Sequence, residues 1–173
     1  MRVLIASLAL VASASVLPAQ NKQSMIADYT RAKATVLAYI DAMPDSALGF
    51  RPTPGVRSFA EQIDHIVLTH YQVAAMVLEG ATEEPSLGDT AVYLHNKAAL
   101  RAASAKAFDA MLRSLEKAPP AVMSKVSAIF GAPPAPGWKW IAMSFEHGTW
   151  TLGQVVPYLR LNKVTPPTYQ IPF

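Results

Sequence analysis

The chain has 173 residues, 51% of them hydrophobic, which is enough for one well-filled core and too little for two ordinary domains. It contains no cysteine, which excludes disulfides, a cysteine nucleophile, a thiolate metal site and a lipid-modified cysteine. The formal net charge of +3 is close to balanced and no basic cluster is present, so we do not expect nucleic-acid binding.

Residues 1–19 have the order of side chains found in a secretory signal peptide. Arg2 is followed by an apolar run over residues 3–11 and then by small residues. The alternatives are a buried first helix or a membrane anchor, but the run is well short of the roughly 20 residues that span a bilayer. We therefore predict cleavage after Ala14 or Ala19, a single domain over residues 20–173, no membrane span, and a periplasmic or secreted location.

Two helices are predicted in the first half of the domain. Apolar residues at three-and-four spacing predict the first over residues 23–43. A proline-rich stretch then makes continued helix costly. Ser58, with Glu61 three residues later, has the spacing of a capping box, in which each side chain satisfies a free backbone N–H at a helix start. The second helix is therefore expected from about residue 59, with Gly80 as its C-terminal cap.

The second half is also predicted to be helical. An alanine-rich third helix is expected over residues 89–117, as the longest element. A long proline-rich loop with at most one short helical turn follows it. This loop is either a lid or pocket wall, or a plain crossover between helices that point the same way. A fourth helix is expected over residues 138–161, with a kink or local unwinding at Pro157 and an extended tail along the bundle surface.

No strand pattern or internal repeat is present, so the predicted fold class is all-α: a four-helix bundle with a long proline-rich loop between helices 3 and 4. The fourth helix carries an apolar stripe and a second stripe that is polar and aromatic. The second stripe predicts either a solvated surface or a cleft, with Trp140, Gln154 and Tyr158 among its lining residues. Trp150 is expected to pack in the core, with a place in the cleft as the alternative.

Two of the four histidines lie on the predicted second helix, five residues apart and therefore about 140° apart around its axis. We do not expect them to share a site. His70 falls on the apolar stripe, which favours a core residue with a hydrogen-bond partner. His65 falls on a polar side, and His95, early in the third helix, is expected to be exposed.

Two segments, RPTPGVRSFAEQIDHI and EHGTWTLGQVVPYLRLNKVTPP, resemble the DinB-like four-helix-bundle superfamily, and the order of elements matches it as well. Many of its members bind a divalent metal through three histidines, one in helix two and two in the last helix. The resemblance implies that His65 and His147 are metal ligands and that Thr151 occupies the third position. A neutral hydroxyl is a poor ligand for zinc or nickel, so we expect no cofactor, or a weakly held divalent metal.

The sequence is compatible with several functions. The favoured one is a binding or stress-associated module that takes a small-molecule ligand, in which His65 and His147 hydrogen-bond across the cleft, with Thr151 and Gln154 completing a polar network. The alternative is a divalent-metal-dependent hydrolase or transferase that uses His65 and His147. A purely structural, partner-binding bundle is a third class. The resemblance also implies a homodimer formed through helix faces.

Overall fold

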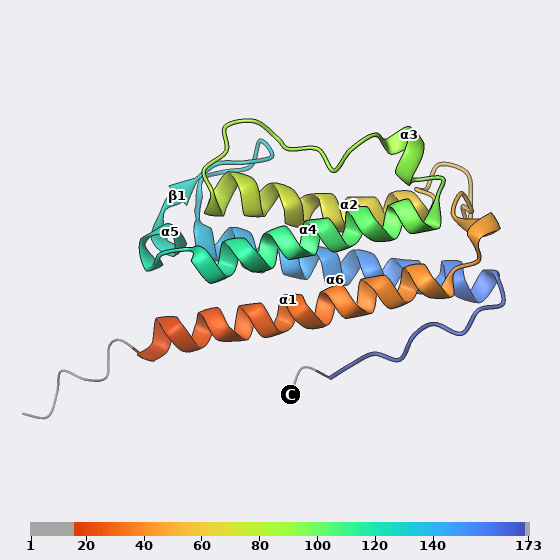
Figure 1. Cartoon of the computed structure of the whole chain (residues 1–173), viewed down its shortest axis with the longest axis horizontal. Helices are drawn as coiled ribbons and strands as arrows, with labels where there is room; N and C mark the ends of the chain where they lie inside the picture. The colour runs from red at the N-terminus through yellow and green to blue at the C-terminus, as the bar shows by residue number, and fades with distance from the viewer. Residues whose placement is uncertain (1–15, 172–173) are drawn as a thin grey trace, which may run out of the picture.

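Four long helices make up most of the chain, and the computed structural model describes residues 16–171, with the side chains of residues 22–171 (Figure 1). The elements in chain order are α1 (Val16–Ala42), the 3-10 turn η1 (Asp45–Ala47), α2 (Phe59–Val73), the π-helical turn η2 (Ala74–Leu78), α3 (Thr90–Tyr93), α4 (Lys97–Lys117), α5 (Pro120–Ser124), β1 (Val126–Ser127), β2 (Ala135–Pro136) and α6 (Gly137–Leu161). Most of the predicted signal peptide lies outside the described residues. Within the described part of the chain, no helix has both the length and the apolar character that a bilayer crossing requires.

The long helices form a bundle in which α1 packs on α4, α4 on α2, and α2 on α6. Figure 1 shows that α1 and α6 run in one direction and that α2 and α4 run in the other. The segment between α2 and α4 therefore crosses the length of the bundle, whereas the segment between α4 and α6 stays at one end. One role expected for the proline-rich loop was a crossover between a third and a fourth helix that point the same way. That expectation is wrong, because the two helices concerned, α4 and α6, are antiparallel.

The core lies along the axis of the bundle and is built from the apolar stripes of all four long helices. Because the chain has no cysteine and therefore no disulfides, burial of these apolar side chains is the main contribution to the stability of the fold. The largest side chains with less than 2% exposure are Tyr29, Phe59, Phe108, Ile40, Met43, Ile63, Ile66, Leu100, Met111, Leu115, Ile141 and Leu159.

The predicted capping box starts α2. The Ser58 hydroxyl accepts a hydrogen bond from the Glu61 backbone N–H at 3.3 Å, and the Glu61 carboxylate accepts one from the Ser58 N–H at 2.7 Å. At the other end, α2 passes into the π-helical turn η2 and stops before Gly80, whose φ of 79° lies in the left-handed region that favours glycine. Both predicted boundaries of the second helix are therefore confirmed.

The predicted third helix is wrong in one respect, because two helices replace it. The Asn96 side chain accepts a hydrogen bond from the Ala99 N–H at 2.9 Å and so begins α4 anew after the short α3. With 21 residues, α4 is also shorter than α1 with 27 and α6 with 25, so it is not the longest element. An asparagine side chain can bond to nearby backbone N–H groups in a non-helical conformation, so Asn96 separates α3 from α4 within an otherwise helix-forming sequence.

The proline-rich loop contains the one short helical turn that was expected, α5, but also two strands that were not. β1 and β2 pair antiparallel over two residues each, with Val126 opposite Pro136 and Ser127 opposite Ala135. Two residues carry no readable alternation, so the sequence could not have predicted this pair. The Trp140 indole N–H fastens the pair to α6, since it donates to the Ser127 and Ala135 carbonyls at 3.0 and 3.1 Å.

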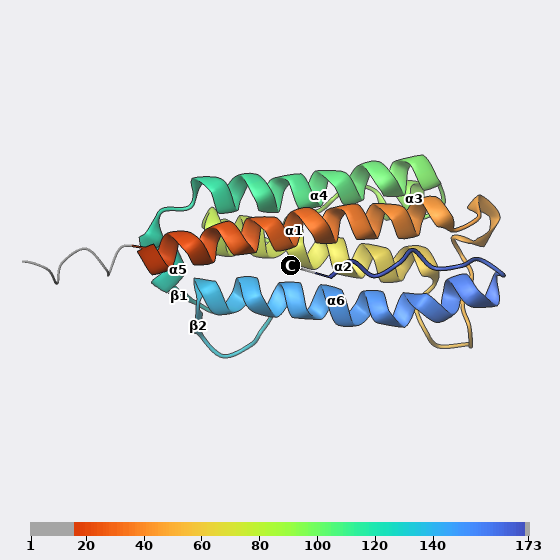
Figure 2. The same cartoon turned by 90° about the horizontal axis from the view of Figure 1, so that it is seen from below.

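The last helix and the tail follow the prediction closely. α6 stays α-helical across Pro157, so the expected local unwinding is absent. The missing N–H leaves the Gly153 carbonyl without its helical partner, but Gly153 is exposed and water can replace that bond. Residues 163–171 then run as an extended tail along the seam between α1 and α6 (Figure 2).

Candidate functional site

His65 on α2 and His147 on α6 face each other across the bundle. Their Nε2 atoms are 3.0 Å apart, and their rings meet edge to face with centroids 4.7 Å apart. The structure thus brings together the two residues that the resemblance implied as ligands. At this separation one Nε2 carries a hydrogen and the other accepts it, so the hydrogen bond expected across the cleft is present. None of the hydrogen bonds described for this chain extends that pair to the Thr151 or Gln154 side chains.

The histidine pair opens into a pocket of about 330 Å³ between α2 and α6. Phe130 forms one wall of it, from the loop between β1 and β2, where its backbone takes a φ of 56°. The proline-rich loop therefore serves as a pocket wall, which was one of its two expected roles. The complete lining is His65, Leu68, Thr69, Gln72, Phe130, Met143 and His147.

His65 is neutral at physiological pH. Partial burial, with smaller contributions from the nearby Arg57 guanidinium and the His147 ring, lowers the pKa of its imidazole to about 4. A neutral imidazole can accept a hydrogen bond or ligate a metal through its free nitrogen, and it donates through the other. His65 therefore offers a polar group without a positive charge.

The donor set around the pair is one ligand short of a catalytic zinc site, which takes three protein ligands and one open position. Two tetrahedral ligands with zinc–nitrogen bonds of about 2.0–2.1 Å would hold their nitrogens about 3.3 Å apart, close to the spacing of this pair. Thr151, however, is buried at 3% exposure and does not line the pocket. Across the residues that the structure describes, no three His, Cys, Asp or Glu side chains gather as a metal site. The residues present do not fit a tightly held zinc or nickel ion.

The other residues of the predicted cleft lie elsewhere. Trp140 and Tyr158 are buried, and the Tyr158 hydroxyl donates to the Arg57 carbonyl at 2.7 Å. Gln154 is exposed, and none of these three lines either pocket described for this chain. Their contact with a ligand therefore stays a prediction.

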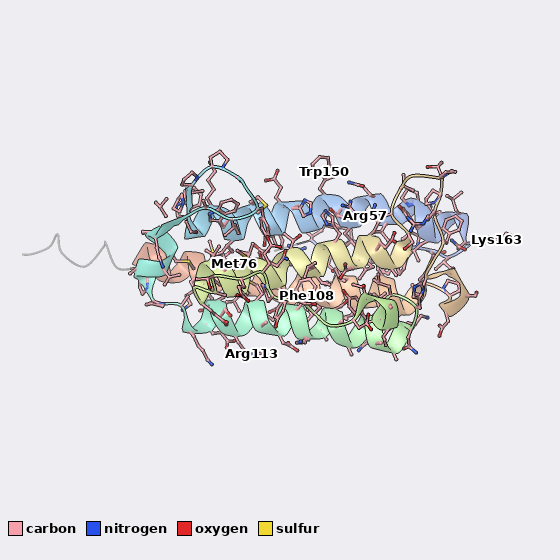
Figure 3. All side chains as sticks on the ribbon, turned by 90° about the horizontal axis from the view of Figure 1, so that it is seen from above. Arg57, Met76, Phe108, Arg113, Trp150 and Lys163 are labelled. Atoms are coloured by element: carbon pink, nitrogen blue, oxygen red, sulfur yellow. The ribbon has the colours of Figure 1, made fainter. Side chains whose placement is uncertain are left out.

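The expectation that Trp150 packs in the core is wrong, and so is the alternative place in a cleft. Its side chain is 72% exposed and projects from the outer face of α6 (Figure 3). Gly148, which is buried, lies two residues earlier and about 200° away around the helix. A helix that turns Gly148 toward the bundle interior must turn Trp150 toward solvent.

The remaining histidines behave as expected. His70 is 1% exposed in the core, and its Nδ1 lies 3.1 Å from the Ser144 hydroxyl. Burial lowers the pKa of His70 to about 3. His95 is exposed. Since His65 and His70 face different pockets, the prediction that they do not share a site is confirmed.

Sequence reasoning missed two contributors to these sites, Phe130 and Tyr29. Phe130 lies in a loop without helical or strand periodicity. The one sequence signal that could have indicated it is an aromatic residue directly before a glycine. Tyr29 lies 115 positions before Ser144 in the sequence, yet the two hydroxyls are 2.6 Å apart beside His70. Such contacts depend on how the helices are docked, which spacing alone does not fix.

Comparisons with known proteins agree with this geometry. The family model described as the DinB superfamily matches residues 28–155. A DinB-like protein from Bacillus cereus ATCC 10987 superposes with a TM-score of 0.69 at 16% identity, covering 84% of this chain and 95% of that one. The DinB-like protein YjoA from Bacillus subtilis gives a TM-score of 0.69 at 15% identity, covering 84% and 96%. A comparison with curated proteins finds no match. The fold is shared with these two structures, and the chain belongs to the DinB superfamily.

Proposed function

We propose that this chain is a small-molecule-binding module whose ligand enters the pocket at the His65–His147 pair. The observation that carries the proposal is the hydrogen-bonded imidazole pair, 3.0 Å apart, at an open pocket with an incomplete metal donor set. Binding pockets combine apolar walls with a few polar groups that fix orientation, which is the composition here. Leu68, Phe130 and Met143 supply the walls, and the imidazoles supply the polar end.

The size and charge of the pocket narrow the ligand class. A volume of about 330 Å³ lies at the lower end of the roughly 300–1,000 Å³ of small-molecule sites. His65 is neutral, and the Arg57 guanidinium lies close enough to lower its pKa. The ligand is therefore a small molecule with an apolar body and one polar or negatively charged group placed toward the imidazoles.

A ligand-binding experiment can be read directly at the histidines. Fragments with one or two rings, bearing a carboxylate, an alcohol or an amide, would be added while the imidazole proton resonances are followed by NMR. We expect the His65 and His147 signals to move together for bound fragments, with the exposed His95 ring as an internal control. The Phe130→Ala variant, which removes a wall and leaves both imidazoles, should weaken binding. Fragments that move His95 as much as the pair, or none that move the pair, would contradict the proposal.

A divalent-metal-dependent hydrolase or transferase is the second candidate. The observation that favours it is the spacing of the two Nε2 atoms, which is close to that of two ligands on one ion. It needs a third donor, which the short, neutral hydroxyl of Thr151 does not supply. Elemental mass spectrometry of the purified protein separates the two candidates. Binding predicts little zinc or nickel, whereas stoichiometric metal that is lost in both His65→Ala and His147→Ala would favour the enzyme.

We also propose that the protein is exported after cleavage of residues 1–19. Support comes from the sequence of the first residues and from a contact of α1 that cleavage would preserve. The Lys22 ammonium donates to the Glu116 and Ala118 carbonyls at 2.7 and 3.1 Å, so cleavage after Ala14 or Ala19 keeps this contact. N-terminal sequencing of the protein from a periplasmic or culture fraction tests export. A retained Met1 in a cytoplasmic fraction would contradict it.

A further inference from the structure

A second cavity lies between α1 and α6, and it shares no lining residue with the pocket at the histidine pair. Of the neighbouring helix pairs in the bundle, α1 and α6 pack most weakly, and the C-terminal tail runs along their seam (Figure 2). The cavity measures about 290 Å³, and Tyr169 of the tail lies at its edge. Its walls are mainly apolar, and include Val36, Ile66, Phe108, Phe145, Leu152 and Val156.

Among the polar side chains that line this cavity, His70 reaches it from the core. Its ring is 1% exposed and packs against the rings of Tyr29 and Phe108, with centroids 5.2 and 5.0 Å away. The Nε2 edge faces α6 at Gly148, where an added Cβ would lie 2.7 Å from Nε2. Gly148 and His70 both line the cavity, so the ring edge that faces Gly148 lies at its wall. None of the described residues forms a hydrogen bond with this nitrogen.

A chain of hydrogen bonds sets the hydrogen-bonding role of that nitrogen. The Tyr29 hydroxyl donates its single hydrogen to the Ile141 carbonyl at 2.9 Å. With the Tyr29 hydrogen on this carbonyl, the Ser144 hydroxyl, 2.6 Å away, donates to Tyr29 and accepts from the His70 Nδ1 at 3.1 Å. In this arrangement, which we adopt, His70 carries its hydrogen on Nδ1. Because burial keeps the ring neutral, Nε2 is left as an acceptor to which no described residue donates, and a bound molecule with an O–H or N–H could supply that donor.

The charge at the cavity is already balanced. Arg31 is the one Lys or Arg among the residues described as lining it. Its guanidinium pairs with the Asp28 carboxylate at 3.0 Å and lies over the Phe145 ring, 5.7 Å from the centroid. A ligand with a formal charge would gain no unpaired partner there and would lose its hydration. The lining therefore selects a neutral molecule.

From these contacts we propose that the α1–α6 cavity binds a neutral, mainly apolar molecule of one or two rings that donates one hydrogen bond, from a hydroxyl or N–H, to the Nε2 of His70. The volume agrees with this class, since a buried apolar cavity of roughly 150 Å³ holds a benzene and this one is about twice as large. The apolar walls supply affinity, and the His70 Nε2 acceptor supplies selectivity for a donor.

Equilibrium dialysis of the purified protein against 1-naphthol and 1-methoxynaphthalene tests the proposal. The two probes share the same ring system, but only the first can donate a hydrogen bond. We expect 1-naphthol to bind about threefold to tenfold more tightly, the worth of one net hydrogen bond. Equal affinities, or no binding of either probe, would overturn the proposal, and this comparison needs no variant protein.

Two variants then locate the site. His70→Asn keeps a donor toward Ser144 but removes the Nε2 acceptor, so the preference for 1-naphthol should fall to about onefold. His65→Ala alters the other pocket and should leave the preference unchanged, which separates this site from the one in the proposed function. A preference that survives His70→Asn, or that is lost in His65→Ala, would place the hydrogen-bond acceptor elsewhere on the protein and overturn the proposal.

Discussion

Replacing Gly148 with alanine should reveal how tightly α6 packs against His70. The added Cβ would lie 2.7 Å from the His70 Nε2 and 2.8 Å from Cε1. The ring cannot swing away cheaply, because Nδ1 is hydrogen-bonded to Ser144 and Phe108 packs against its face. Overpacking of this kind costs about 1–3 kcal/mol, while alanine gains about 1 kcal/mol over glycine inside a helix. We expect Gly148→Ala to lower the free energy of unfolding by about 0–2 kcal/mol.

Gly153→Ala is the matched control on the same helix. A Cβ at Gly153 meets no atom within 4 Å, so this variant keeps only the helix-propensity gain and should be about 0.5–1 kcal/mol more stable than the wild type. Urea unfolding followed by far-UV circular dichroism gives both values. Gly148→Ala should be about 1–3 kcal/mol less stable than Gly153→Ala. If the two variants were equally stable, the close packing of His70 on α6 would be refuted.

Three further predictions concern the cap, the buried histidine and self-association. Ser58→Ala removes the capping hydrogen bond of α2 and should cost about 1 kcal/mol in urea unfolding; no loss would mean that the cap is redundant. His70 stays neutral in the fold because burial lowers its pKa to about 3, whereas the unfolded chain takes up a proton near pH 6.5. The unfolded state then binds more protons, so wild-type stability relative to His70→Asn should fall as the pH drops from 7 toward 3; a pH-independent difference would contradict this. The implied homodimer should appear in light scattering at twice the chain mass, and a monomer mass would exclude it.

Much of the fold could be predicted because its signals are local. The capping box needs only Ser58 and Glu61, and the left-handed cap needs only Gly80, so both ends of the second helix were predicted correctly. The angle of about 140° between His65 and His70 also follows from helix geometry alone. Helix boundaries at Asn96 were harder, because an asparagine inside an alanine-rich run is compatible with either a cap or a continued helix.

The candidate sites depended on contacts between helices, which the sequence does not encode at any fixed spacing. A resemblance was needed to bring His65 and His147 together, and their 3.0 Å separation follows from the packing of α2 on α6. The cavity exists because α1 and α6 pack weakly, a property of the whole bundle. Trp150 was misplaced for a related reason: a large aromatic residue suggests the core, but the burial of Gly148 on the same helix fixed the rotation of α6.

The central claim is that the histidine pair belongs to a binding pocket with an incomplete metal site. Calorimetric titration with zinc tests it most directly, on the wild type and on Thr151→His, which restores the third histidine of the family pattern. We predict weak zinc binding by the wild type and an affinity at least about tenfold higher for Thr151→His, with the gain abolished by a further His147→Ala change. Stoichiometric zinc binding by the wild type, as tight as that of Thr151→His, would contradict the claim.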